Sequence, residues 1–134
     1  MKEYYKNLPD YMPSAELEPA FRRFLNEVAT KKYDLLEALE SLLELADRQW
    51  HTYGLLDDTI KSKIEAWLIG VNDITSTEVV EYSTSILGRI GLERMYSIMK
   101  DSLSGNIKNE IRLIIQETID ELDDHVSDPY FGMR

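Results

Sequence analysis

The residue types in this chain that could take part in chemistry are almost all carboxylates. The 134 residues include 25 aspartates and glutamates, 15 lysines and arginines, two histidines and no cysteine. Without cysteine the chain has no disulfide, no thiolate nucleophile and no cysteine-ligated zinc or iron–sulfur centre. The carboxylates leave three kinds of chemistry to consider: proton transfer, metal binding and attraction of a cationic partner.

One group of residues has a spacing that resembles a metal site. Glu117, Glu121 and His125 follow one another at intervals of four residues, which would place them along one face of a helix. A carboxylate site in a four-helix bundle needs Glu-x-x-His facing inward, and Leu122 stands where that glutamate would be. His51 follows Trp50 at the expected end of a helix, where a cation favours the helix dipole, so its predicted role is structural. No metal site and no cofactor are therefore predicted.

The chain shows no catalytic motif. It contains no Gly-x-Ser-x-Gly, no phosphate-binding Walker loop and no dinucleotide-binding glycine pattern. Gly88 and Gly91 follow a helical stretch rather than a strand. Nothing in the sequence marks two carboxylates as buried together with their pKa values split, as acid–base catalysis requires. We therefore expect a protein that is not an enzyme.

The net charge of -10 is concentrated in two segments. Residues 33–60 carry one basic and seven acidic residues, and residues 106–134 carry three basic and seven acidic residues. In each segment the carboxylates recur every three or four residues or a multiple of that spacing, so they form a row on one helix face with few cations to neutralise it. The first row is Glu37, Glu40, Glu44 and Asp47, and the second is Glu110, Glu117, Glu121 and Asp124, with Asp120 and Asp123 beside it.

Two interpretations of these rows stay open. They are either solvated faces that keep a small protein soluble or an acidic surface that attracts a basic protein partner. Nucleic acid is excluded as a partner, because most of the surface would repel a polyanion. On the second interpretation the predicted partner-binding residues are Glu37, Glu40, Glu44, Glu78, Glu81, Tyr82, Glu117, Asp120, Glu121 and Asp124, with Trp50 and Tyr53 as aromatic anchors.

The elements that position these residues are predicted to be helices throughout. From Ser14 onward the apolar residues recur with a period near 3.6, and no stretch alternates long enough to suggest a strand. Residues 1–13 are expected to form an irregular lead. The first helices are expected over about residues 15–29 and 33–49, a third helix is capped by Asp57, and the last two cover about residues 92–103 and 106–125. Pro19 is acceptable only in the first turn of its helix.

The fourth helix has the sharpest local signal in the chain. Thr75-Ser76-Thr77-Glu78 fits a capping box, in which the Thr75 hydroxyl and the Glu78 carboxylate each accept a backbone N–H. Gly88 and Gly91 are expected to mark the end of this helix.

A repeat is visible along the second half of the chain. A shift of 28 residues places eight core positions between residues 64 and 87 on core positions between residues 92 and 115. The repeat predicts helix hairpins over residues 57–91 and 92–125, preceded by a less regular hairpin over residues 14–56. Together they form one domain over residues 1–134. Residues 126–134 form a tail that either covers the last hairpin or anchors a partner.

The run from Glu78 to Gly91, EVVEYSTSILGRIG, resembles the second helix of a HEAT-like repeat, and the resemblance extends over about residues 57–125. The last hairpin differs by Gln116 in place of a glycine, and the aspartate and arginine ladder is missing. The resemblance implies an all-α, right-handed array of about six helices in antiparallel hairpins. In such arrays the second helix of each pair lines one face, which is often the binding face.

In type the chain also resembles small bacterial immunity proteins, which are often cysteine-free, acidic and helical. Many of them block a nuclease toxin by mimicking the charge of nucleic acid, so the resemblance implies a basic toxin domain as partner. The alternative is a HEAT-like scaffold or adaptor without catalytic activity, whose partner is not especially basic. We expect a cytoplasmic protein, because residues 1–6 lack the apolar core of a signal peptide and no apolar run approaches the roughly 18 residues of a membrane span.

Overall fold

The computed structural model describes residues 1–131, apart from the side chain of Asp124, and every regular element in this part is helical. The predicted all-α fold class is therefore confirmed. None of the helices in these residues is long and apolar enough to cross a membrane. The helices are α1 (Lys2–Lys6), α2 (Ser14–Thr30), α3 (Leu35–Trp50), α4 (Asp58–Val71), α5 (Thr77–Ile90), α6 (Glu93–Ser102) and α7 (Asn109–Leu122), followed by the 3₁₀ turn η1 (Asp123–His125).

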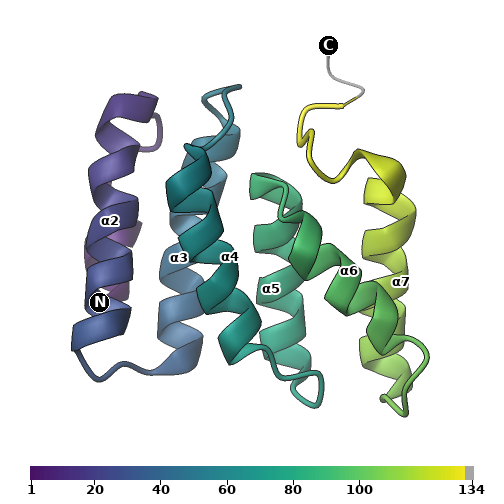
Figure 1. The fold of residues 1–134 in the computed structure, drawn as a ribbon. Helices are drawn as coiled ribbons and strands as arrows, with labels where there is room; N and C mark the ends of the chain where they lie inside the picture. Colours follow the sequence, from purple (N-terminus) through teal and green to yellow (C-terminus); the bar gives the residue numbers. More distant parts are fainter. Residues whose placement is uncertain (132–134) are drawn as a thin grey trace.

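The longer helices form two layers (Figure 1). Helices α2, α4 and α6 make the layer nearer the viewer, and α3, α5 and α7 make the layer behind it. The closest packing in the molecule is between α3 and α5, followed by that between α5 and α7, so the second layer is continuous. Its three helices run in the same direction. Their C-terminal ends therefore lie together at one end of the molecule, which also carries the end of the chain.

The core lies between the two layers and consists of the apolar stripes of the helices. In α2 the stripe includes Leu17, Phe21 and Phe24, and in α3 it includes Leu39 and Leu42, all fully buried. These positions recur every three or four residues, as an amphipathic helix requires. Burying one such side chain contributes about 1.5–3 kcal/mol, so these stripes hold the layers together.

The expectation of an irregular lead over residues 1–13 is wrong for Lys2–Lys6, which forms α1 and packs against α3. The ring of Tyr5 is fully buried, and its hydroxyl donates a hydrogen bond to Glu27 at 2.5 Å. The guanidinium of Arg48 donates to the carbonyl oxygens of Leu8 and Pro9 at 2.9 and 2.8 Å. A helix this short is unstable alone, so these distant contacts form it and local sequence patterns do not reveal it.

Three local predictions also need correction. Ser76, not Thr75, caps α5 by accepting the Val79 amide at 3.3 Å, while the Thr75 hydroxyl donates to Asp73 at 2.6 Å. Gly88 lies inside α5, and only Gly91 ends it.

Gly91 has a φ of 81°, and a Cβ there would lie 2.7 Å from the Val126 carbonyl oxygen. Pro19 lies beyond the first turn of α2, which begins at Ser14, so that helix lacks one interior amide donor. The predicted Asp57 cap of α4 is confirmed.

The repeat is present with a different offset. Helix α7 begins and ends 32 residues after α5, with Asn109 against Thr77 and Leu122 against Ile90. The predicted offset of 28 is therefore one helical turn short. A shift of four residues keeps the same face of a helix inward, so the apolar pattern matches at both offsets.

Candidate functional site

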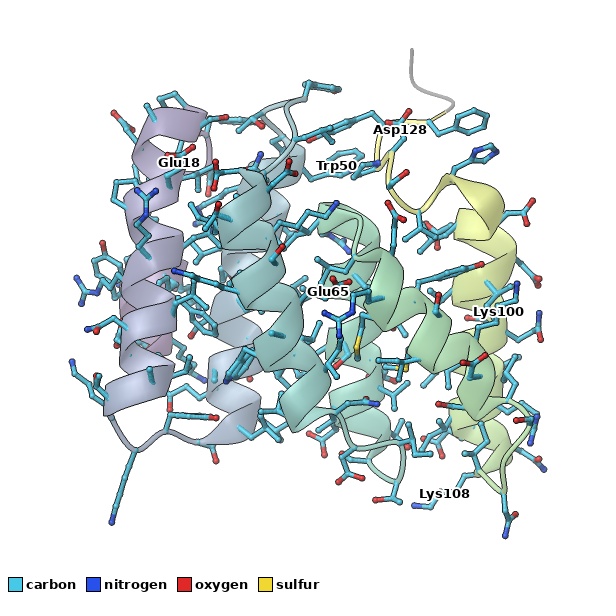
Figure 2. All side chains as sticks on the ribbon, viewed as in Figure 1. Glu18, Trp50, Glu65, Lys100, Lys108 and Asp128 are labelled. Carbon is cyan, nitrogen blue, oxygen red and sulfur yellow. The ribbon has the colours of Figure 1, made fainter. Side chains whose placement is uncertain are left out.

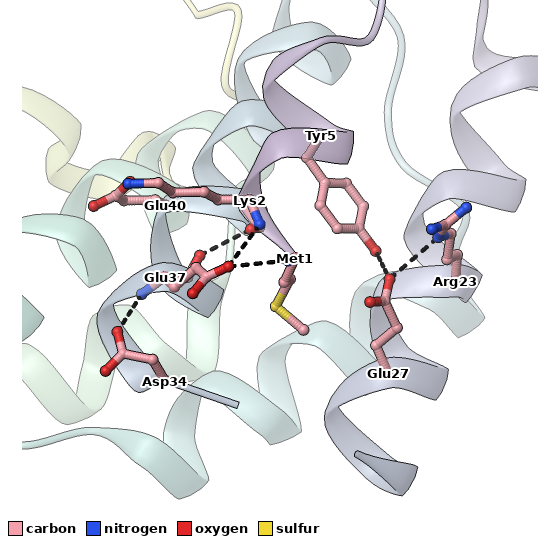
Figure 3. Close-up of polar contacts among 9 residues, drawn as sticks. Met1, Lys2, Tyr5, Arg23, Glu27, Asp34, Glu37 and Glu40 are labelled. Atoms are coloured by element: carbon pink, nitrogen blue, oxygen red, sulfur yellow. Dashed lines mark hydrogen bonds and ion pairs between the residues drawn. The ribbon is translucent and has the colours of Figure 1, made fainter. Parts of the chain in front are cut away.

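The N-terminal half of the acidic row on α3 is bound by cations of the lead (Figure 3). The Glu37 carboxylate lies 3.0 Å from the Met1 amine and accepts the Lys2 backbone amide, also at 3.0 Å. The hydrogen bond from the Lys2 amide, followed by that from the amine, lowers the pKa of the Glu37 carboxyl. The Lys2 ammonium in turn lies 3.5 Å from Glu40. These two carboxylates therefore attach α1 to α3.

The C-terminal half of the same row is also compensated. Arg48 lies 2.7 Å from the Glu44 carboxylate, and Arg89 of α5 forms an ion pair with Asp47. The expectation that few cations neutralise this row is therefore wrong. Counting charges within one segment missed the cations of α1 and α5, which are distant in sequence and close in the fold.

The carboxylates of α5 and α7 differ from those of α3, because none of them forms an ion pair with a residue in the described part of the chain. They are also exposed. Asp120 accepts a hydrogen bond from the Gln116 amide at 3.1 Å, and the side chain of Asp124 lies outside the described residues. We call the following set the α5–α7 acidic surface: Glu78, Glu81, Glu110, Glu117, Asp120 and Glu121.

Tyr82 connects this surface to α3. Its ring is half-buried on α5, and burial is the main cause of the raised pKa of its phenol. The nearby carboxylates of Glu40, Glu78 and Glu81 raise that pKa further, because they disfavour a phenolate beside them. The structure thus brings together predicted binding residues from two helices around one tyrosine.

A groove of about 470 Å³ lies where α3, α5 and α7 end. Helix α3 contributes Asp47 and Trp50, with His51 just after it, and α5 contributes the small residues Ser85 and Gly88. The remaining lining residues come from α5, α7, η1 and the tail: Thr84, Arg89, Thr118, Glu121, Leu122, His125, Asp128, Pro129 and Phe131. The groove is continuous with the α5–α7 acidic surface through Glu121.

The tail closes one side of the groove. Tyr130 is only 3% exposed, and its hydroxyl donates to the carbonyl oxygens of Gln49 and Gly54 at 3.1 and 3.0 Å. The Trp50 indole donates to the Pro129 carbonyl at 3.4 Å. Figure 2 shows Trp50 and Asp128 together at this end of the molecule. The tail up to Phe131 therefore runs back from α7 to the loop after α3, and residues 132–134 lie outside the described part.

The two predicted aromatic anchors have different environments. Trp50 is the last residue of α3 and lines the groove, whereas Tyr53 is 66% exposed in the following loop. Their rings and that of Tyr130 lie 5.6–6.4 Å apart, which forms an aromatic cluster beside the groove. Sequence reasoning missed the contribution of Gly88 and Phe131. The signal for Gly88 was a small residue on the outward face of a helix, which resembled a helix end instead.

The histidines have packing partners at the groove. The His51 Nδ1 atom lies 2.7 Å from the Asp47 carbonyl oxygen, in keeping with a structural role at the end of α3. The His125 ring stacks on Phe131 with a centroid distance of 3.4 Å. Among the residues whose side chains are described, no group of three or more histidines, aspartates or glutamates could hold a metal ion.

A comparison with family models, curated proteins and solved structures found no match to this chain. The function is therefore inferred from the acidic surface and the groove themselves.

Proposed function

We propose that the protein is a non-catalytic binding module of the cytoplasm that holds a basic protein partner against the α5–α7 acidic surface. The partner that fits is a basic toxin domain, such as a nuclease, which the protein neutralises as an immunity protein. One observation carries this proposal: the carboxylates of α5 and α7 are exposed and unpaired in the described residues, whereas those of α3 are compensated within the chain.

The physical argument concerns the cost of unpaired charge. Like charges one helical turn apart destabilise a helix by a few tenths of a kcal/mol each, and Glu117 and Glu121 have that spacing. A cationic partner removes this repulsion and is attracted to the surface before contact. Because Glu37, Glu40 and Glu44 already have cations, we assign most of the attraction to Glu78, Glu81, Glu117, Asp120 and Glu121.

We further propose that the two layers form a HEAT-like, right-handed array of helix hairpins. The arrangement of α3, α5 and α7 side by side supports this, because second helices occupy one layer in such arrays. The acidic surface then lies on the face that helical arrays commonly use for binding.

The experiment that tests the proposed function is growth rescue during co-expression with the product of the adjacent gene. We expect the wild-type protein to restore growth and the double variant Glu117→Lys/Glu121→Lys to fail. The matched control is Glu16→Lys/Asp101→Lys, which makes the same charge change on exposed residues of α2 and α6. Absence of rescue by the wild-type protein, or equal rescue by both double variants, would overturn the proposal.

The second candidate is a scaffold or adaptor whose partner is not basic. The compensated row on α3 favours it, because those carboxylates serve the fold rather than a partner. The two functions differ in salt dependence. Binding to a scaffold barely changes with ionic strength, whereas binding through the acidic surface loses association rate as salt rises.

A further inference from the structure

The groove at the ends of α3, α5 and α7 is suited to a cation. Glu121 is exposed in it and forms no ion pair with any described residue, while Asp47 is already paired with Arg89. Three helix C-termini meet here, and each carries a partial negative charge. The lining therefore holds a free carboxylate within a region of negative potential.

The aromatic lining distinguishes between kinds of cation. Trp50 is half-buried in the wall of the groove, and Phe131, which is 58% exposed, lies on the side formed by the tail. A planar guanidinium stacks on aromatic rings and pairs with a carboxylate at the same time. A lysine ammonium is more strongly hydrated and gains less from such a wall.

The size of the groove fits one long side chain. A volume of about 470 Å³ lies within the range of roughly 300–1,000 Å³ typical of ligand pockets. Ser85 and Gly88 have little or no side chain, which leaves space between α3 and α7. A side chain entering there reaches Glu121 and Trp50 from the same position.

We propose that this groove receives an arginine side chain of the basic partner, with Glu121 as its carboxylate and Trp50 as its stacking surface. The inference rests on the proposed function, because the rest of the partner would cover the adjoining α5–α7 acidic surface. Arginine in the groove would fix the position of the partner, while the exposed carboxylates supply the long-range attraction.

The test measures binding of hexa-arginine and hexa-lysine peptides at low ionic strength by titration calorimetry. Wild-type protein is compared with Glu121→Gln and with the control Glu117→Gln. Both variants lose one carboxylate of α7, but only Glu121 lines the groove. We expect hexa-arginine to bind more tightly than hexa-lysine, and Glu121→Gln to weaken hexa-arginine by about fivefold, against less than about twofold for Glu117→Gln.

A second readout places the peptide in the groove. The indole N–H resonance of Trp50, assigned with Trp50→Phe, is expected to shift on adding hexa-arginine, while that of Trp67 stays unchanged. Equal effects of the two glutamine variants together with an unmoved Trp50 resonance would overturn the groove proposal and leave the acidic surface in place. Failure of both peptides to bind at low ionic strength would overturn the proposed function itself.

Discussion

Arg89 of α5 is paired with Asp47 of α3 at the edge of the groove, so one carboxylate of the lining already holds a guanidinium. The pair joins the two most closely packed helices of the molecule. Arg89 is also the only lysine or arginine among the described residues that line the groove. It is therefore the intramolecular counterpart of the contact that we propose for a partner.

Replacing Arg89 is expected to strengthen the binding of a basic peptide. Arg89→Gln removes a cation from the groove and leaves Asp47 unpaired, so hexa-arginine should bind about two- to fivefold more tightly at low salt. Titration calorimetry measures the change. The control is Arg94→Gln, which removes a cation from the exposed surface of α6. Weaker binding by Arg89→Gln than by the control would contradict the assignment of the groove.

The buried contact between Tyr5 and Glu27 is expected to stabilise the fold. Tyr5→Phe keeps the ring but removes a hydrogen bond to a buried carboxylate, which should lower the free energy of unfolding by about 1.5–3 kcal/mol. Urea denaturation measures this loss. Tyr4→Phe is the matched control, because it keeps the ring 3.5 Å from the Arg23 guanidinium and should change stability little. Equal stability of the two variants would mean that α1 is not fixed through this hydrogen bond.

Glu65 of α4 is expected to act as the missing cap of α6. Its carboxylate is buried and accepts the backbone amides of Arg94 and Met95 at 2.9 and 3.1 Å, and no side chain within α6 performs this task. Glu65→Ala leaves both amides without this acceptor and should cost about 1–3 kcal/mol in thermal or urea unfolding.

Two further variants separate the cap from a general charge effect. Glu65→Gln keeps an acceptor oxygen and should lose less stability than Glu65→Ala. Glu93→Ala removes an exposed carboxylate from the first turn of α6 and should cost no more than about 1 kcal/mol. A larger loss for Glu93→Ala than for Glu65→Ala would refute the capping role.

The contact of α1 with Glu37 is expected to depend on pH. The Lys2 amide and the Met1 amine lower the pKa of this carboxyl in the folded state, so its contribution to stability is present above the ordinary glutamate pKa of about 4.3. The contribution is lost as the pH falls through the lowered value. Glu37→Gln should therefore be less stable than the wild type at neutral pH and equally stable in acid. A difference that persists unchanged into acid would contradict this sign.

The helices were predictable from the sequence because each long helix has a continuous apolar stripe, as in Leu17, Phe21 and Phe24 of α2. The cap of α5 was placed one residue early, because Thr75 and Ser76 both carry a suitable hydroxyl and only the fold selects between them. Helix α1 was missed because its stability comes from Tyr5 and other contacts with distant residues.

The candidate site was predictable only in part. The rows of carboxylates and Trp50 are visible in the sequence, since a helical period places them without knowledge of the fold. The cations that neutralise the α3 row are not, because Met1 and Lys2 reach Glu37 and Glu40 from more than 30 residues away. The groove combines residues between Asp47 and Phe131, and no local pattern predicts that combination.

The central claim is that a basic partner binds through α5 and α7 rather than through α3 or the opposite layer. The most direct measurement is the map of backbone amide chemical shifts on adding hexa-arginine, at about 0.01 M and about 1 M salt, where the screening lengths are about 30 and 3 Å. We predict shifts in residues 78–89 and 110–128 at low salt that are lost at high salt. Shifts centred on α2, α4 and α6, or shifts that persist unchanged at high salt, would contradict the claim.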